Sequence, residues 1–234
     1  MNRSRTFWRG VVAVVVVAAG LGTGQALPVA AENTVIVPRD SSLYGNTYGE
    51  WGARWMQWAF SIPVDRSPIA DTTGGHCGEL QSGPVWFLAG TFGTGPVTRS
   101  CMVPAGKALF FPLVATTFGA GVFDCEPTVP GTLCNLAALR VSAGAPLDGA
   151  TLSATLDGNT IRHLRDQRVQ LPAMTLTYPP DGVFGAAAGT YSPNVGDGYW
   201  LMLAPLSRGA HTLHFRAEVP GFVADVTYHL TVAP

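Results

Sequence analysis

The chain has 234 residues and a formal net charge of −1, and only 12% of its residues are charged. Because the charge is low and no basic cluster is present, the composition argues against nucleic acids and anionic membrane surfaces as partners. The 28 glycines and 18 prolines favour short strands joined by turns over long helices. The sequence therefore predicts a mainly β protein, and no motif in it names a reaction.

The first 31 residues have the pattern of a secretory signal peptide. Basic residues, an apolar run and a small-residue cleavage site follow one another as Arg3, Arg5 and Arg9, then Gly10–Leu21, then Val29-Ala30-Ala31. The run is shorter than the ~20 residues that cross a bilayer. We expect export, cleavage after about Ala31 and no membrane span in the mature chain. Residues 32–234 would carry 11 Lys and Arg against 15 Asp and Glu, a formal charge of −4.

The four cysteines would then reach an oxidising compartment, where disulfides persist. The local pairs Cys77–Cys101 and Cys125–Cys134 are expected, although four cysteines allow two other pairings. Each bond would stabilise the fold by about 2–4 kcal/mol, chiefly by constraining the unfolded chain. The cysteine and histidine spacings match no metal site, so neither a metal nor a cofactor is predicted.

One segment, about 48–61, carries the signals of a helix. Thr47 and Glu50 match a capping box, in which each side chain binds a free backbone amide of the first turn. Aromatic residues recur at helical spacing on one face, as Trp51, Trp55 and Trp58. This face has two interpretations: a core face packed against a sheet, or a partly exposed platform on which sugar rings stack.

The rest of the chain has the patterns of strands and turns. Residues 63–83 are interpreted as a loop, and strands are predicted at 84–89, 101–103, 108–111, 152–156, 160–164, 174–178, 199–204, 211–219 and 223–232. Asp157-Gly158 and Pro220-Gly221 are the turns of two hairpins. Pairing across the second turn puts Arg216 opposite Asp225.

Residues 179–198 are predicted to form a loop of unusual length, and such loops are often functional. The loop contains Phe184, Tyr191 and Asp197. It is either a mouth or lid over a binding face, with Tyr191 and Asp197 as ligand contacts, or a surface excursion without a role.

Two resemblances add to this pattern. The ending Leu206–Phe215 places a small loop before a strand of the type G-x-H-T-L, followed by one last strand. This resembles bacterial extracellular immunoglobulin-like modules, which implies a β-sandwich and no particular activity. The full chain resembles a family of uncharacterised secreted bacterial proteins, which implies export; the segments that carry this resemblance are Tyr48–Trp55, Gly83–Gly90 and Val103–Pro112.

The expected architecture is therefore a mainly β fold with one aromatic-rich helix near the mature N-terminus. Residues 32–138 would hold this helix and a disulfide-stapled β region, and residues 139–234 an immunoglobulin-like β-sandwich. No clear linker separates the two parts. The sequence leaves open whether they are two domains or one continuous sandwich.

Three functions are compatible with these features. The first is binding of an extracellular or envelope polysaccharide, with Trp51, Trp55, Tyr191 and Asp197 as contacts. The second is a structural or protein-interaction role in the envelope. The third is glycoside hydrolysis by paired carboxylates, for which the candidates are Glu50, Asp71 and Glu79. A serine nucleophile has no signature, because G-x-S-x-G is absent and Ser142, Ser153 and Ser207 lie in no nucleophile context.

Overall fold

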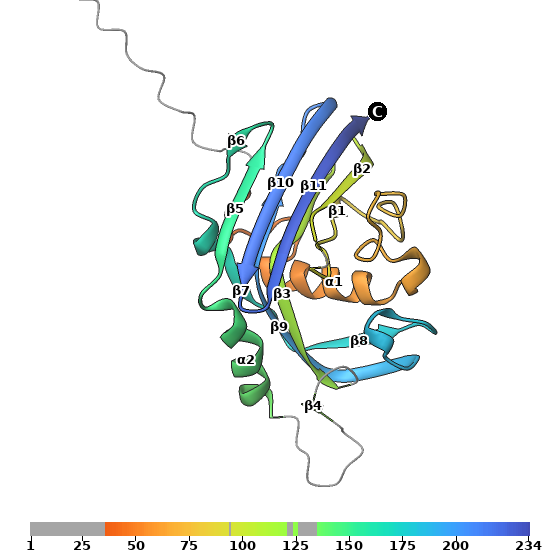
Figure 1. Ribbon diagram of the computed structural model, residues 1–234, viewed down its shortest axis with the longest axis vertical. Coiled ribbons are helices and arrows are strands. Elements are labelled where there is room, and N and C mark those ends of the chain that lie inside the picture. Colours follow the sequence, from red (N-terminus) through yellow and green to blue (C-terminus); the bar gives the residue numbers. More distant parts are fainter. Residues whose placement is uncertain (1–35, 94, 121–123, 126–134) are drawn as a thin grey trace, which may run out of the picture. The chain divides into compact units, whose positions relative to one another are not determined.

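The computed structural model describes residues 36–93, 95–120, 124–125 and 135–234 of the chain. Its described strands form two sheets, one ordered β1-β3-β9-β7 with β4 and β8 attached to β3 and β9, the other ordered β2-β11-β10-β5-β6 (Figure 1). The strands are β1 (Val85–Phe87), β2 (Val97–Pro104), β3 (Ala108–Ala120), β4 (Asp124–Cys125), β5 (Thr151–Leu156), β6 (Asn159–Thr160), β7 (Arg168–Gln170), β8 (Met174–Tyr178), β9 (Gly189–Leu203), β10 (Gly209–Val219) and β11 (Phe222–Ala233). The helices are α1 (Tyr48–Phe60) and α2 (Leu136–Gly144). The expected mainly β architecture, a β-sandwich with an aromatic-rich helix, is confirmed.

We call the sheet of β3 and β9 the inner sheet, because it is covered on both faces. One face packs against the sheet of β10 and β11, the outer sheet, and the other packs against α1 (Figure 1). Neighbouring residues of β3 therefore enter different cores: Phe111 faces the outer sheet, whereas Phe110 faces the helix. This double burial explains why β3 reads as a continuous apolar run rather than an alternating one.

The two halves of the chain share both sheets. Strands from before residue 138 lie beside strands from after it, since β2 pairs with β11 and β3 pairs with β9. The described residues from Ile36 to Pro234 accordingly fall into one compact unit. The question that the sequence left open is answered in favour of one continuous sandwich.

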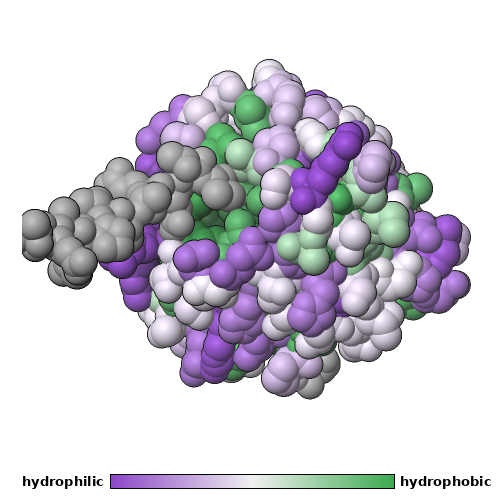
Figure 2. Space-filling model, turned by 90° about the horizontal axis from the view of Figure 1, so that it is seen from above, coloured by the Kyte–Doolittle hydropathy of each residue, from purple (hydrophilic) through white to green (hydrophobic). Residues whose placement is uncertain are grey.

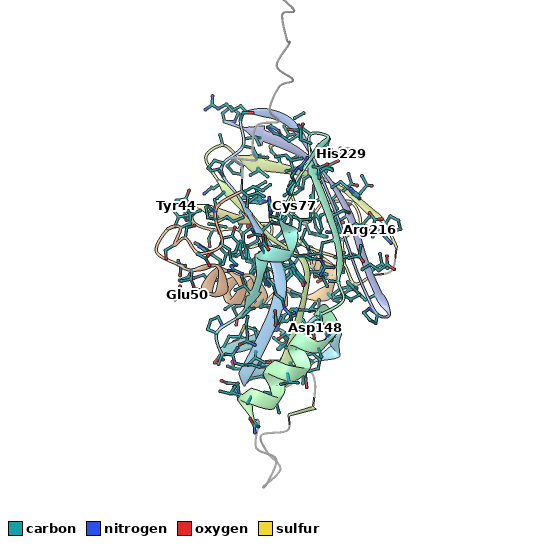
Figure 3. The ribbon with its side chains drawn as sticks, turned by 90° about the vertical axis from the view of Figure 1, so that its left-hand side faces the viewer. Tyr44, Glu50, Cys77, Asp148, Arg216 and His229 are labelled. Atoms are coloured by element: carbon teal, nitrogen blue, oxygen red, sulfur yellow. A yellow bond between two sulfur atoms is a disulfide. The ribbon has the colours of Figure 1, made fainter. Side chains whose placement is uncertain are left out.

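The last hairpin has the predicted register, with Arg216 opposite Asp225. The two side chains nevertheless form other ion pairs: Arg216 binds Glu218 at 2.9 Å and Asp225 binds His214 at 2.9 Å. Arg216 and His229 lie on the solvent side of the outer sheet (Figure 3). The alternating pattern of this hairpin thus predicted its backbone pairing but not its side-chain partners.

The expectation of one loop over 179–198 is wrong beyond residue 188. Residues 189–198 belong to β9, which pairs with β8 through its first part and with β3 through its second. Glycine, proline and asparagine have low β propensity, so the strand is imposed by its partners rather than by local preference. The helix α2 was also not predicted, although Asn135 caps it by accepting from the amide of Ala137 at 2.9 Å.

The segment before β1 is tied to the edge of the outer sheet. Cys77 and Cys101 form a disulfide, which confirms the first expected pair. Next to it the Ser100 amide donates to the Thr73 carbonyl at 2.8 Å. The loop thereby covers edge strand β2, whose backbone would otherwise be open to pairing. The second expected pair, Cys125–Cys134, lies outside the residues whose side chains are described.

Within the described ranges, no helix has the length and hydropathy that a membrane span requires. On the face seen in Figure 2, hydrophilic residues surround smaller groups of hydrophobic ones. Scattered apolar surface of this kind is normal and needs no partner to explain it.

Candidate functional site

The helix α1 begins at the predicted capping box. The Thr47 amide donates to Glu50 Oε2 at 2.7 Å, and the Glu50 amide donates to Thr47 Oγ1 at 3.3 Å. The Thr47 amide and the Thr47 hydroxyl both donate to this carboxylate, and these two bonds lower the pKa of Glu50. Glu50 is therefore held ionised at the surface, which suits a cap and not a general acid.

The tryptophan face of α1 is a core face. Trp51, Trp55 and Trp58 are all buried. Their indole N–H groups donate to the carbonyls of Leu43, Leu88 and Glu79, at 2.8–2.9 Å. The interpretation as an exposed platform for sugar rings is wrong, because the rings are satisfied inside the protein. A Cβ at Gly52 would lie 2.3 Å from Leu171 Cδ2, so glycine at this position lets the helix approach the inner sheet closely.

The remaining candidate carboxylates have local structural roles. Asp71 accepts the amides of Thr73 at 2.7 Å and His76 at 2.9 Å. Burial opposes its ionisation, but these bonds outweigh burial and lower its pKa. Glu79 pairs with Arg66 at 3.4 Å. Neither Asp71 nor Glu50 has the raised pKa that a glycosidase acid needs.

Tyr191 and Asp197 lie on β9 and form no mouth. The Tyr191 hydroxyl donates to the Ala187 carbonyl at 3.0 Å. Asp197 is 5% exposed and binds Arg168 at 3.1 Å; this hydrogen bond, opposed by burial, raises the pKa of Arg168. The Arg168 guanidinium also donates to the Gly144 carbonyl at 2.9 Å. This pair therefore ties α2 to the inner sheet.

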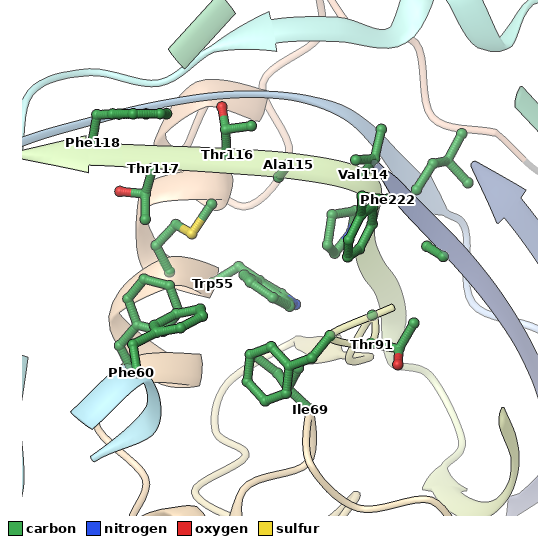
Figure 4. A pocket seen from close by; sticks show the side chains of 17 residues that line it. Trp55, Phe60, Ile69, Thr91, Val114, Ala115, Thr116, Thr117, Phe118 and Phe222 are labelled. Carbon is green, nitrogen blue, oxygen red and sulfur yellow. The ribbon is translucent and has the colours of Figure 1, made fainter. Parts of the chain in front are cut away.

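A pocket of about 370 Å³ opens beside the C-terminal half of α1, between this helix and β3 (Figure 4). Its lining residues are Trp55, Met56, Phe60, Ile69, Gly90, Thr91, Phe92, Pro112, Leu113, Val114, Ala115, Thr116, Thr117, Phe118, Phe184, Phe222 and Ala224. None of these described residues carries a charge. Concave apolar pockets of this size range are the usual form of small-molecule sites.

The hydroxyls of the two threonines on β3 are already engaged. Thr116 donates to the Ala143 carbonyl at 2.6 Å, and Thr117 donates to the Val195 carbonyl at 3.1 Å. The side chain of Thr117 points into the cavity and that of Thr116 points away (Figure 4). The cavity wall along β3 is therefore apolar in effect.

Phe184 forms the rim. Its backbone has φ 66° and ψ 7°, a left-handed conformation that costs a non-glycine residue about 1–2 kcal/mol. Its side chain packs edge-on against Phe60 and Phe92, with ring centroids 5.4 and 5.2 Å apart. Even so, Phe184 remains 52% exposed. Phe184 thus lines this pocket, whereas Tyr191 and Asp197, which lie on β9, do not.

A buried arginine holds the opposite wall. Arg99 is 1% exposed and donates to the carbonyls of Ile69 at 3.1 Å and Gly90 at 2.7 Å, two lining residues. It also donates to the Asp71 and Ala89 carbonyls. Carbonyl dipoles thus solvate the buried cation. The predicted strand covered only residues 101–103, so this clamp on the first half of β2 was not predicted.

One further cluster has the residue types of a catalytic triad. His211 Nδ1 lies 2.7 Å from Asp157 Oδ2, and its Nε2 lies 3.3 Å from Ser207 Oγ. The same Nε2 is 2.9 Å from the Ser207 carbonyl oxygen, which only accepts hydrogen bonds. Both ring nitrogens therefore act as donors, and Nε2 is not free to take a proton from the hydroxyl. The cluster is an imidazolium bridge between the β5–β6 turn and the start of β10.

A second, shallower depression of about 760 Å³ surrounds the N-terminal end of α1. Its lining is mixed, and its polar side chains include Arg39, Ser41, Glu50, Arg140 and Gln170. Glu50 lies at the edge of the molecule, on the side away from Arg216 and His229 (Figure 3). We call this depression the polar groove.

Comparison of the chain with protein-family models, with curated proteins and with solved structures gives no match.

Proposed function

We propose that this protein binds a small, uncharged, apolar molecule in the pocket between α1 and β3. The observation that carries the proposal is the chemistry of the described lining, which is apolar and aromatic, carries no charge and has its β3 hydroxyls engaged. A charged ligand would lose its hydration there without gaining a partner. An apolar ligand gains about 25 cal/mol for each Å² removed from water.

The same pocket argues for binding rather than catalysis. Acid–base or nucleophilic chemistry requires a titratable or nucleophilic group within hydrogen-bond reach of the ligand. The described lining offers Thr91 as its remaining hydroxyl, which accepts a long hydrogen bond of 3.4 Å from the Gly93 amide. Its other polar groups are engaged or belong to the backbone.

The experiment is a titration of the purified protein with N-phenyl-1-naphthylamine, a neutral dye that fluoresces in apolar surroundings. We expect saturable fluorescence at one site per chain. Thr117→Phe should abolish it, because the new ring fills the cavity into which Thr117 points. Thr117→Val, which keeps the shape and loses only the hydroxyl, is the matched control and should bind as the wild type does.

Phe184→Ala gives a second measurement that does not depend on a core substitution. It should lower the affinity for the dye by several-fold. The unfolding midpoint should stay nearly unchanged, because this side chain is half exposed. Tyr44→Ala is its control: Tyr44 is 45% exposed, has φ 51° and lies outside the pocket. Equal dye affinity in Thr117→Phe, Phe184→Ala and the wild type would reject the proposal.

Polysaccharide binding is a second candidate function, with the polar groove rather than the buried tryptophans as its binding surface. Its support is that the groove presents both hydrogen-bond donors and acceptors, in the side chains of Arg39, Ser41 and Gln170. Cosedimentation with isolated envelope polysaccharide tests it. We expect saturable depletion that weakens in Gln170→Ala, and absence of depletion would remove this candidate. Among the described residues, no feature favours the hydrolase or the envelope-scaffold hypothesis over these two.

We also propose that the protein acts after export, with residues 1–31 removed. The support is the signal-peptide pattern and the Cys77–Cys101 disulfide, a bond typical of oxidising compartments. The mass of the protein recovered outside the cytoplasm tests this. A chain that begins near Glu32 is the expected result, and a full-length chain retained inside would contradict it.

A further inference from the structure

Resting on the proposed pocket function, we propose that the ligand is a neutral aromatic compound of two or three fused rings. The proposal follows from three properties of the pocket: the absence of charge in its described lining, its aromatic walls and its volume. The absence of charge favours apolar ligands in general, and the aromatic walls and the volume select among them.

The pocket is walled by rings that already meet one another edge to face. At the rim, Phe184 stands at 82° to Phe60 and at 74° to Phe92. Trp55 also lines the pocket and stands at 71° to Trp200 and at 61° to Trp58, two rings that lie behind the lining. The aromatic side chains that wall it come from separate parts of the chain and are Trp55, Phe60, Phe92, Phe184 and Phe222. Phe118 borders the pocket from β3, but its ring lies on the face of the strand that points away from the cavity (Figure 4).

A ligand ring would continue this pattern, because an edge-to-face contact adds a favourable quadrupole interaction to the area that is buried. A saturated chain would gain the area alone. Phe184 is the residue at which this difference is easiest to measure, because its ring is at the mouth and half exposed, whereas Phe60 is buried and Phe92 is partly buried. It is therefore assigned as the residue that selects rings over saturated ligands.

The volume sets the size of the ring system. An apolar protein cavity of about 150 Å³ holds one benzene molecule. The pocket of about 370 Å³ is more than twice as large, so it fits two or three fused rings. One end remains open at the rim, which leaves room for a small polar substituent to reach solvent.

The test compares naphthalene with decalin, its saturated counterpart, by equilibrium partitioning with gas chromatography of the free ligand. The quantity measured is the ratio of the two dissociation constants, because the ratio cancels losses common to both ligands. In Phe184→Leu we expect naphthalene to lose about three- to tenfold in affinity relative to decalin, which corresponds to the loss of one aromatic contact. Tyr44→Leu is the control and should keep the wild-type ratio.

The outcomes separate this inference from the proposed function. If both ligands bind and Phe184→Leu leaves the ratio unchanged, the aromatic assignment is overturned while the apolar pocket stands. If decalin binds and naphthalene does not, saturated chains are the ligand class and the assignment fails. If neither ligand nor the dye binds the wild type, both the inference and the proposed function fail.

Discussion

The two cores of this protein are built differently on the two faces of the same strands. The core between the sheets is lined mainly by aliphatic residues and joined by a few aromatics such as Phe111 and Phe215. The core between the inner sheet and α1 is dominated by large rings, with Trp200 stacked on Phe110 at 5.3 Å. The pocket opens at the margin of the second core, and Leu113, Val114 and Ala224 of the first core also line it.

The difference follows from the shapes of the packed surfaces. Two twisted sheets interdigitate small branched side chains over a regular spacing and leave few gaps. A single helix on a sheet meets it along one stripe, and rigid rings cannot fill the space at the end of that stripe. Close approach occurs where glycine allows it, near Leu171, and the gap opens at the other end of α1. The pocket is thus a consequence of helix-on-sheet packing with aromatic residues.

The largest expected effect comes from Arg99, at the edge of the core between the sheets. Arg99→Met removes the donors to several buried carbonyls, so we expect a loss of about 3 kcal/mol or more in the free energy of unfolding. Urea unfolding measures it. Arg54→Met, at the exposed helix surface, is the control. A loss below about 1 kcal/mol would show that the clamp does not hold the wall.

Gly52→Ala tests the close approach of the helix. Helix propensity alone would stabilise the variant by about 1 kcal/mol, but the new methyl would overlap fully buried Leu171. We expect a net loss of about 1–3 kcal/mol. Gly49→Ala is the matched variant, because its Cβ would lie 3.3 Å from Pro172, and it should change stability by less than about 1 kcal/mol. Equal effects would refute the packing argument.

Phe110 and Phe111 are adjacent, both fully buried, and face opposite cores. Substitution of either by leucine should cost about 1–2 kcal/mol, less than truncation to alanine. Only Phe110→Leu should also lower the affinity for the dye. Phe110 stacks on Trp200, and Trp200 packs edge-on against the pocket residue Trp55. Paired urea and dye titrations measure both effects. If Phe111→Leu weakened the dye equally, the two cores would not be independent.

The smallest effect concerns His211, outside both cores. Burial alone would lower the pKa of His211, but its hydrogen bonds to Asp157 and to the Ser207 carbonyl outweigh burial, so the net pKa is raised. Burial alone would raise the pKa of Asp157, but its hydrogen bonds from His211 and Thr212 outweigh burial, so the net pKa is lowered. The histidine contribution is complete below its unfolded pKa of about 6.5 and is lost as pH rises through the higher folded value. The aspartate contribution is lost only in acid, as pH falls through its depressed folded value.

The wild type should therefore be more stable than His211→Gln by about 1 kcal/mol near pH 5, and this difference should shrink above pH 7. The expected difference is small because Asp157 is 42% exposed and solvent screens the pair. Urea unfolding at pH 5 and pH 8.5 measures the change. A difference that grows with pH would contradict the imidazolium bridge.

Local signals were sufficient wherever one residue or one short pattern decides the structure. The capping box at Thr47 set the start of α1, and the alternation around Pro220-Gly221 set the register of the last hairpin. The local cysteine pair Cys77–Cys101 is likewise confirmed. In the first two cases the interacting groups are close in sequence, or the period of two leaves one register that buries the apolar face.

The sequence by itself therefore determined the mainly β composition, the aromatic helix and the last hairpin. Only the tertiary structure decided that residues 189–198 form a strand, because their pairing partners supply what their propensity lacks. It also decided that the tryptophans are core and that Phe92, Phe184 and Phe222 meet at one pocket. No local pattern marks these residues, since packing between segments far apart in the chain brings them together.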